Sequence, residues 1–307
     1  MGKKSGKNFK FYMRKIKNIL IFGADGMLGQ EFKNHFKYNK LFKVMAANQA
    51  MADITDFNQV LKIIKKYRPD IMVNCAAIIN VDYCENNPVK AWRVNTIGAG
   101  NIVSALNELS LFKTVVLHIS TSDVFGNIDR KVRAENDAPQ PVNVYGWSKL
   151  GGEKIVAAEA KIKNIKYFIV RTSWIYSEYK DTFVDFIVKL LNNKKPTPII
   201  SDQYNTITWT KDLVNACEKL IKASHKYQSG IYHLASQAKE KLSKYDMALV
   251  VAKQLNFNKK YLKKGFKKNI LSAARPDYAI LACNKFISLP GWQASLSKYL
   301  NLKYGKH

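Results

Sequence analysis

Residues 17–29 read KNILIFGADGMLG, a short apolar segment that runs directly into glycines at Gly23, Gly26 and Gly29. An amphipathic segment follows to about Tyr38, so the order is strand, glycine turn, helix. This order predicts a dinucleotide site: Gly23 allows the tight turn, Gly26 lets the backbone approach a pyrophosphate, and Gly29 permits close helix packing. Three glycines at this spacing can also form an ordinary turn, but the apolar strand before them favours the site.

Apolar and helical segments alternate through the first half of the chain, which predicts a doubly wound, Rossmann-like parallel α/β sheet. The expected strands are 41–47, 71–77, 114–120 and 167–172, and the expected helices are 56–67, 87–109 and one from about 144. The alternation weakens beyond Tyr176, where we expect a smaller α/β lobe with helices at 182–191, 210–223 and 243–255 and a strand at 230–234. The predicted division is a basic flexible tail (1–16), a dinucleotide-binding domain (17–174) and a mainly substrate-binding lobe (175–307), parts of which can return to the first domain.

The second strand ends at Asn48, where NAD-specific sites usually present an acid to the ribose diol. Asn48 removes the repulsion that a 2′-phosphate would meet, and Lys43 could add charge nearby, so we expect NADPH to bind, with NADH as the alternative. Asn48 can equally be only a turn residue. After the third strand, Ala76 and Ala77 are small enough for a cofactor to lie close to the backbone, although ordinary tight packing explains them too.

Tyr145 and Lys149 are four residues apart at the predicted start of a helix, so their side chains share one face. An ammonium beside a phenol stabilises the tyrosinate, and we expect it to lower the Tyr145 pKa from about 10, which makes a usable general acid. Tyr176 and Tyr299 also have Lys four residues later, and such a pair is usually just a solvated helical pair. Only Tyr145 follows a glycine turn and a strand that ends in hydroxyls at 120–122.

The composition narrows the classes of protein. The chain has 307 residues, 47% hydrophobic residues and a net charge of +27. Such a positive charge is compatible with binding to nucleic acid, to an anionic membrane surface or to an anionic substrate. The basic residues are spread without a nucleic-acid motif, so no specific nucleic-acid partner is expected. No apolar stretch approaches the roughly 20 residues of a membrane span. The cysteines and histidines lack metal-site spacing, and we expect a cytoplasmic protein without a bound metal.

Five motifs together resemble the extended short-chain dehydrogenase/reductase superfamily and, within it, the dTDP-4-dehydrorhamnose reductase family. They are Gly23-x-x-Gly26-x-x-Gly29, Asn74-Cys75-Ala76-Ala77, Ser120-Thr121, Tyr145-x-x-x-Lys149 and Arg171-Thr172-Ser173-Trp174. Further matches in the same order are Arg68 to Asn74, Val81-Asp82, Ser201-Asp202-Gln203 and Ala274-Arg275-Pro276. The resemblance covers about residues 17 to 290.

The resemblance implies reduction of the 4-keto group of a nucleotide-linked 6-deoxy-hexose by NADPH or NADH, in deoxysugar and polysaccharide biosynthesis. A homodimer is left open. It implies Tyr145, Lys149 and Thr121 as catalytic residues. It also implies the residues that bind the cofactor. Gly26, Met27 and Leu28 would contact the pyrophosphate, Asp53 and Ile54 the adenine, and Ala76, Ala77 and Ile78 the inner half of the cofactor. The other cofactor residues are Gly23, Gly29, Asn48, Tyr145 and Lys149. The substrate residues it implies are Thr121, Ser122, Val81, Asp82, Trp174 and Arg275.

Three departures from the family pattern concern the substrate more than the reaction class. Residues 120–125 read STSDVF where the family commonly has STDYVF, residues 203–208 have lost a Gly and a Pro, and Ile78 replaces a common His. A nucleotide-sugar epimerase or dehydratase of the same superfamily is one alternative. A non-catalytic NADP-binding subunit, like the regulatory subunit of methionine adenosyltransferase, is another, although the joint presence of Tyr145, Lys149 and Thr121 argues against it.

Overall fold

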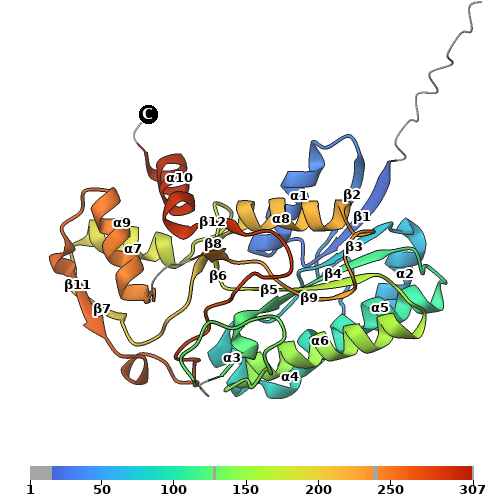
Figure 1. Ribbon diagram of the computed structural model, residues 1–307, viewed down its shortest axis with the longest axis horizontal. Helices are drawn as coiled ribbons and strands as arrows, with labels where there is room; N and C mark the ends of the chain where they lie inside the picture. The colour runs from blue at the N-terminus through green and yellow to red at the C-terminus, as the bar shows by residue number, and fades with distance from the viewer. Residues whose placement is uncertain (1–15, 127–128, 238–240, 306–307) are drawn as a thin grey trace, which may run out of the picture.

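A central parallel sheet organises the computed structural model, which describes residues 16–126, 129–237 and 241–305. Its six strands lie in the order β2-β1-β3-β4-β5-β9 (Figure 1). Their bounds are β1 Lys17–Phe22, β2 Phe42–Ala47, β3 Ile71–Asn74, β4 Val115–Thr121, β5 Tyr167–Thr172 and β9 Gly230–His233. The predicted α/β class is confirmed, whereas the predicted tail, apart from Ile16, lies outside the described residues.

Helices cover both faces of the sheet (Figure 1). One face carries α2 (Phe57–Tyr67), α5 (Ala99–Glu108) and α6 (Val144–Ile162), whose apolar side chains share a core with Leu20 and Met72. The other face carries α1 (Met27–Lys37) and α8 (Thr210–Lys222), which pack on Ile19, Val73 and Phe168. The inner strands β1, β3, β4 and β5 are largely buried on both faces, so their sequences are mostly apolar.

The sheet order reverses at β1, which lies between β2 and β3. Phe22 at the end of β1 pairs with Ala47 and with Asn74, so the segments that follow these three strands begin side by side. Ligands of open α/β sheets bind in the crevice outside the carboxyl ends of the strands at such a reversal. The glycine turn lies directly in this crevice.

The chain beyond β5 builds a second core from short pieces. Two two-stranded ladders and three helices surround Val188, Val251 and Leu296, and a third ladder places Leu289 in the core beside α1 and α8. The strands are β6 Trp174–Tyr176 with β8 Ile207–Trp209, β7 Thr197–Ile200 with β11 Leu262–Gly265, and β10 Ser236–Gln237 with β12 Leu289–Gly291. The helices are α7 Phe183–Asn193, α9 Lys244–Gln254 and α10 Trp292–Tyr304. α8 and β9 return to the central sheet.

Two predicted boundaries are wrong. β3 ends at Asn74 instead of residue 77, and the single helix expected over 87–109 is α4 (Pro88–Trp92), a π-helical turn (Arg93–Gly98) and then α5. Helices α3 (Val81–Asn86) and α10 and three short 3-10 turns were not predicted. π-helical turns inside helices often occur at functional sites, because they turn a side chain out of the regular spacing.

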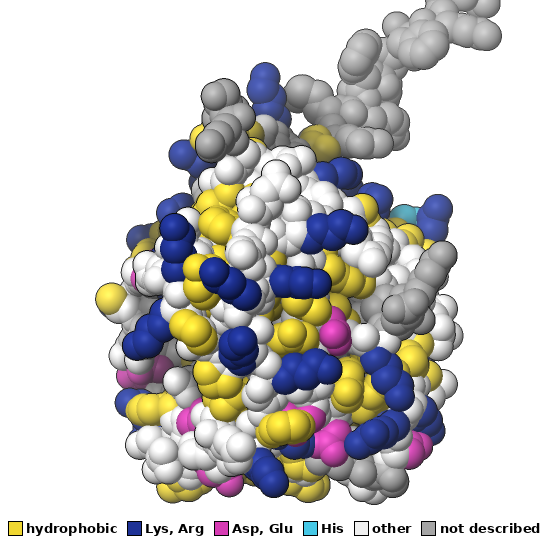
Figure 2. Space-filling view, turned by 90° about the vertical axis from the view of Figure 1, so that its left-hand side faces the viewer, with side chains coloured by type: hydrophobic (Ala, Val, Ile, Leu, Met, Phe, Trp, Pro, Cys, Tyr) yellow, Lys and Arg dark blue, Asp and Glu magenta, His cyan; other side chains and the backbone are white. Residues whose placement is uncertain are grey.

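Basic side chains are scattered across the surface formed by the C-terminal lobe (Figure 2). Lys and Arg are dispersed there among apolar and uncharged groups instead of forming one stripe. Within the described residues, no helix has the length and apolarity needed to cross a bilayer.

Candidate active site

The glycine turn is built so that no side chain fits at two of its positions. Gly23 has φ +76, and a Cβ there would lie 2.6 Å from the Ala76 nitrogen. A Cβ on Gly29 would lie 2.1 Å from the Gly23 carbonyl oxygen. Gly26 is the N-cap of α1 and offers no capping side chain, so the first N–H groups of the helix, at Met27 and beyond, keep their hydrogen-bonding capacity. This cradle fits an anionic pyrophosphate.

A groove leads from the glycine turn along the ends of the strands. It consists of two cavities of about 470 and 530 Å³ that share Gly26, Cys75 and Ala77 as lining residues. The first is lined by these predicted cofactor residues: Gly23, Gly26, Asn48, Asp53, Ile54, Ala76, Ala77 and Ile78. The second is lined by the others: Met27, Leu28, Gly29, Tyr145 and Lys149, again with Gly26 and Ala77. The structure therefore brings every predicted cofactor residue to one continuous groove.

The expectation for Lys43 is wrong. Lys43 pairs with Asn18 near the beginning of β1, so it lies toward the end of the sheet opposite to the glycine turn. The basic residue that does line the first cavity is Lys90, from α4. Asn48 lines the cavity as well, and its Oδ1 accepts a hydrogen bond from the Met51 N–H at 3.0 Å, so it is a turn residue and a cavity residue at once.

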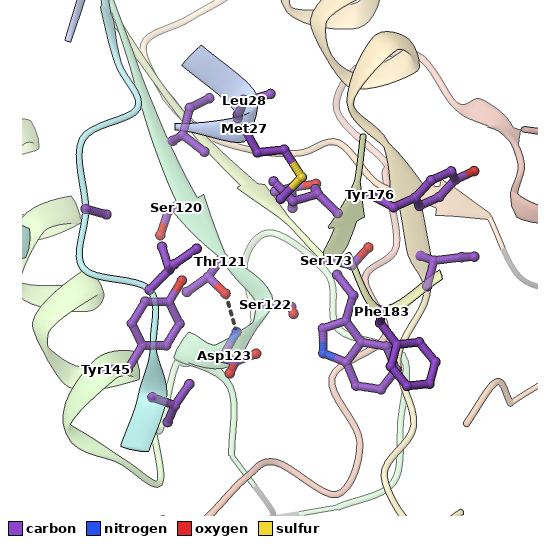
Figure 3. A pocket seen from close by; sticks show the side chains of 18 of the residues that line it. Met27, Leu28, Ser120, Thr121, Ser122, Asp123, Tyr145, Ser173, Tyr176 and Phe183 are labelled. Carbon is purple, nitrogen blue, oxygen red and sulfur yellow. Dashed lines mark hydrogen bonds between the residues drawn. The ribbon is translucent and has the colours of Figure 1, made fainter. Parts of the chain in front are cut away.

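Tyr145, Lys149 and Thr121 meet in the second cavity. Asn143 caps α6 by accepting a hydrogen bond from the Gly146 N–H at 2.8 Å, which fixes the helix start at the predicted place. Thr121 ends β4, and Figure 3 shows its hydroxyl and that of Tyr145 directed into the same part of the pocket. Lys149 is 3% exposed, and its Nζ donates to the Ile119 carbonyl oxygen at 2.7 Å.

The expected lowering of the Tyr145 pKa by Lys149 is not found. Burial and the nearby Asp123 carboxylate raise the pKa of Tyr145, and only a hydrogen bond with Thr121 opposes them. The Lys149 ammonium is bound to a backbone carbonyl, and burial lowers its own pKa to about 8 despite the favourable charge of Glu153. The phenol therefore keeps its proton at neutral pH, so it is available as a donor.

The predicted substrate residues divide into two groups. Thr121, Ser122, Val81, Trp174 and Arg275 line the second cavity. Asp82 does not line it: its carboxylate accepts from Ser272 Oγ and the Ala273 N–H and pairs with Arg275 at 2.8 Å. Burial would raise the Asp82 pKa, but these bonds lower it to about 2. Asp82 therefore holds the segment that carries Arg275.

Several pocket residues were missed from the sequence. Asp123, Gln203, Lys244 and Phe183 line the same cavity as Tyr145. Asp123 is 8% exposed, and burial raises its pKa. The Asp that the family pattern places directly after Thr121 stands one residue later here, which was the signal for Asp123. Lys244 carries no signal of its own among 50 Lys and Arg residues.

A buried ion pair supports the pocket from behind. Arg171 Nε and Nη2 donate to the two carboxylate oxygens of Glu153 at 2.8 and 2.7 Å, and each side chain is 2% exposed. Ser120 Oγ donates to the same carboxylate at 2.5 Å. These bonds join β4, β5 and α6, the three elements that carry Thr121, residues 171–172 and Tyr145.

Asn95, on the π-helical turn, fixes two segments of the groove. Its Oδ1 accepts from the Ile78 N–H at 2.8 Å, and its Nδ2 donates to the Ile78 carbonyl oxygen at 3.0 Å and to Ser148 Oγ at 2.9 Å. Ile78 lines the cofactor cavity, and Ser148 precedes Lys149. Asn95 was not predicted as a site residue, because the sequence predicts a regular helix here and not the π-helical turn that carries it.

The other two Tyr-x-x-x-Lys pairs do not direct a phenol hydroxyl into the pocket. Tyr299 is buried in the C-terminal core on α10, where Lys303 Nζ lies 3.2 Å from its hydroxyl oxygen. Tyr176 borders the pocket from β6, but its hydroxyl points away from the cavity (Figure 3). Position in the fold, and not the spacing itself, distinguishes Tyr145.

A parallel sheet with a dinucleotide groove that ends at a Tyr, a Lys and a Thr defines an oxidoreductase of the short-chain dehydrogenase/reductase type. Residues 17–304 match the model of a protein family described as RmlD substrate binding domain. The chain therefore belongs to the dTDP-4-dehydrorhamnose reductase family.

Individual relatives support the membership. The chain is 32% identical to the spore coat polysaccharide biosynthesis protein SpsK of Bacillus subtilis, over 92% of this chain and 96% of that protein. It is 30% identical to a dTDP-4-dehydrorhamnose reductase of Mycolicibacterium smegmatis, over 87% of this chain and 78% of that protein. A solved dTDP-4-dehydrorhamnose reductase of Bacillus anthracis, in complex with NADP, has a TM-score of 0.83 and 29% identity, covering 92% of this chain and 98% of that one.

Proposed function

We propose that the protein reduces the 4-keto group of a nucleotide-linked 6-deoxy-hexose with NADPH, as a step in deoxysugar and polysaccharide biosynthesis, with NADH as the second-choice cofactor. The observation that carries this proposal is the meeting of Tyr145, Thr121 and Lys149 in the cavity that continues the glycine groove. The family membership supports both the cofactor and the class of substrate.

The chain's own residues supply the proton and the electrostatics. When bound, the reduced nicotinamide supplies the hydride. Tyr145 donates its proton to the C4 carbonyl oxygen, which becomes negative in the transition state, and the Thr121 hydroxyl donates a hydrogen bond to the same oxygen. Because burial raises the Tyr145 pKa, the phenol is protonated when substrate arrives. Lys149 would hold the ribose hydroxyls of the cofactor, and solvent restores the proton of the tyrosinate left behind.

The remaining assignments belong to the same proposal. Residues 17–174 bind the dinucleotide, and 175–307 mainly bind substrate, with α8 and β9 returned to the first domain. Ser122, Val81, Trp174 and Arg275 contact the sugar nucleotide, and Asp82 acts by holding Arg275. A cytoplasmic location, a homodimer and the absence of a specific nucleic-acid partner stay predictions.

Steady-state absorbance at the reduced-nicotinamide band tests the function. With NADPH in excess, candidate 4-keto sugar nucleotides should cause oxidation of one NADPH per sugar. An epimerase or dehydratase would convert sugar without net oxidation, and a non-catalytic binding protein would do neither.

We expect Gly26→Val to abolish cofactor binding while the protein stays folded. Gly26 has φ −70, which any residue adopts, and its added Cβ would lie 3.1 Å from the Gly23 carbonyl oxygen, a tight contact that a small shift of the turn must relieve. The branched side chain would also fill the groove. The measurement is NADPH titration by fluorescence, with thermal unfolding alongside. Gly291→Val is the matched control, since Gly291 is also a helix N-cap and a Cβ there meets nothing within 4 Å. Unchanged affinity in Gly26→Val would refute the cofactor placement.

Cofactor choice should depend on Asn48. NADPH should bind at least as tightly as NADH, and Asn48→Asp should weaken NADPH about tenfold, or ~1.4 kcal/mol, because a carboxylate would repel the 2′-phosphate. The new carboxylate could still accept from Met51, so the turn should persist. Titration of both cofactors with both proteins decides this. An equal loss for NADH would show that Asn48 acts only through the turn.

The activity should fall in mildly alkaline solution. Lys149 has a pKa lowered to about 8 by burial, so raising the pH through this value removes the charge with which it would hold the ribose hydroxyls of the cofactor. We expect kcat/KM to decline above pH about 8, because this parameter reports groups of the free enzyme. In Lys149→Arg the decline should move beyond the accessible range, since guanidinium does not deprotonate in proteins. A decline at the same pH in that variant would assign it to another group.

A further inference from the structure

Lys244 lies in the pocket although nothing in the proposed chemistry uses it. It is the first residue of α9, and Ser243 caps that helix by accepting a hydrogen bond from the Asp246 N–H at 3.1 Å. Ser243 in turn donates to the Asp246 carboxylate at 2.6 Å, so the start of the helix is fixed on both sides. From this position Lys244 lines the same cavity as Thr121 and Tyr145.

Two aromatic rings hold its ammonium group. Lys244 Nζ lies 5.0 Å from the ring centroid of Trp174 and 5.6 Å from that of Phe183. Such cation–π contacts stabilise a cation that has lost part of its water. They leave its N–H donors without acceptors, because a ring face offers no lone pair. Figure 3 shows Phe183 on the side of the pocket opposite to Tyr145.

The other cations of this cavity are already engaged. Lys149 donates to the Ile119 carbonyl oxygen, and Arg275 pairs with Asp82 and donates to the Ala273 carbonyl oxygen at 2.7 Å. Within residues 16–126, 129–237 and 241–305, by contrast, no hydrogen bond or ion pair engages Lys244 Nζ. Burial lowers the Lys244 pKa and Arg275 lowers it further, while Asp123 acts in the opposite direction.

A partly dehydrated ammonium with unused donors is costly unless an acceptor reaches it. Phosphate oxygens are strong acceptors, and Lys binds them as a compact charge. We propose that Lys244 binds the diphosphate of the nucleotide-linked substrate, an inference that rests on the function proposed above. In this arrangement the sugar lies toward Tyr145 and Thr121, and the diphosphate crosses the aromatic pair on the side of α9.

Lys244 then sets specificity for the linked form of the sugar. A free 4-keto sugar would reach Tyr145 but would offer no phosphate oxygen to the Lys244 ammonium. The KM for the free sugar should therefore be higher than the KM for the nucleotide-linked sugar. Because Lys244 does not contact the reacting carbonyl in this arrangement, kcat should depend on it only weakly.

Binding of thymidine diphosphate and of thymidine, measured by calorimetry on the full chain loaded with NADP⁺, tests the proposal without turnover. Lys244→Met should weaken thymidine diphosphate about 10–100-fold, the loss of one charge-assisted contact, and leave thymidine unchanged within about twofold. Lys244→Arg should keep most of the affinity. Lys241→Met is the matched control, because Lys241 is exposed outside the cavity and lies 5.9 Å from the Tyr278 ring centroid. Lys244→Gln replaces Lys244→Met if the latter fails to fold.

Three results would overturn the proposal. If Lys244→Met binds thymidine diphosphate like the parent, Lys244 is not the diphosphate residue and the reductase function stands. If Lys241→Met loses as much affinity as Lys244→Met, the attraction comes from the general positive charge. If the parent binds neither thymidine diphosphate nor uridine diphosphate yet reduces a 4-keto sugar, the substrate carries no diphosphate at this place.

Discussion

Tyr145→Phe is expected to lower kcat by about 10²–10⁴-fold, the usual worth of a positioned general acid. The variant loses only the hydroxyl, so the pocket shape and the glycine groove should be unaffected. NADPH should therefore bind with near-parental affinity while turnover with a 4-keto sugar nucleotide collapses. The Tyr145 pKa, raised by burial, makes this hydroxyl a donor and not a permanent tyrosinate.

The chain contains its own controls for this experiment. Tyr176→Phe should keep near-parental kcat, because the Tyr176 hydroxyl points away from the cavity (Figure 3). Tyr299→Phe should also keep kcat but lose stability, since the Tyr299 hydroxyl donates to Asp185 at 3.0 Å in the C-terminal core. If Tyr145→Phe turned over like the parent, another group would have to donate the proton.

Arg171→Met is expected to destabilise the fold by about 3–5 kcal/mol, the usual consequence of leaving one member of a buried ion pair alone. The Glu153 carboxylate would lose its paired guanidinium at a site that is 2% exposed, with Ser120 as its main remaining partner. The measurement is denaturant unfolding, read as a shift of the midpoint at constant slope.

An exposed ion pair provides the control for the expected loss of stability in Arg171→Met. Lys189 and Asp181 form an ion pair with side chains 65% and 66% exposed, so Lys189→Met should leave the unfolding midpoint nearly unchanged. The double variant Arg171→Met with Glu153→Met should recover much of the stability, because it removes the lone buried charge. If Arg171→Met alone were neutral, the pair could not be what joins β4, β5 and α6.

Local signals in the sequence were sufficient to predict the central sheet and the position of Tyr145 at the start of a helix. The glycine turn, the start of α6 and the hydroxyls at the end of β4 each depend on neighbouring residues, and the structure places all of them as expected. The six short strands beyond β5 span two to four residues each, too few for a period to be recognised.

Interactions between distant residues could not be predicted. Lys149 was expected to act on Tyr145, but it is held by the carbonyl of Ile119, thirty residues earlier. Lys43 is the second residue of β2, and because β1 and β2 run parallel it lies at the end of the sheet away from the glycine turn. Lys244 enters the pocket only because α9 packs beside β6 and α7, which no pattern along the chain specifies.

Transfer of deuterium from NADPH labelled at the nicotinamide C4 gives the most direct test of the proposed reduction. The sugar nucleotide formed should carry one deuterium, at the sugar C4, as seen by mass spectrometry and proton NMR, and Tyr145→Phe should form it about 10²–10⁴-fold more slowly. A protein that binds NADPH tightly yet transfers no label to any 4-keto sugar nucleotide would contradict the proposal, and its groove would then serve binding without reduction.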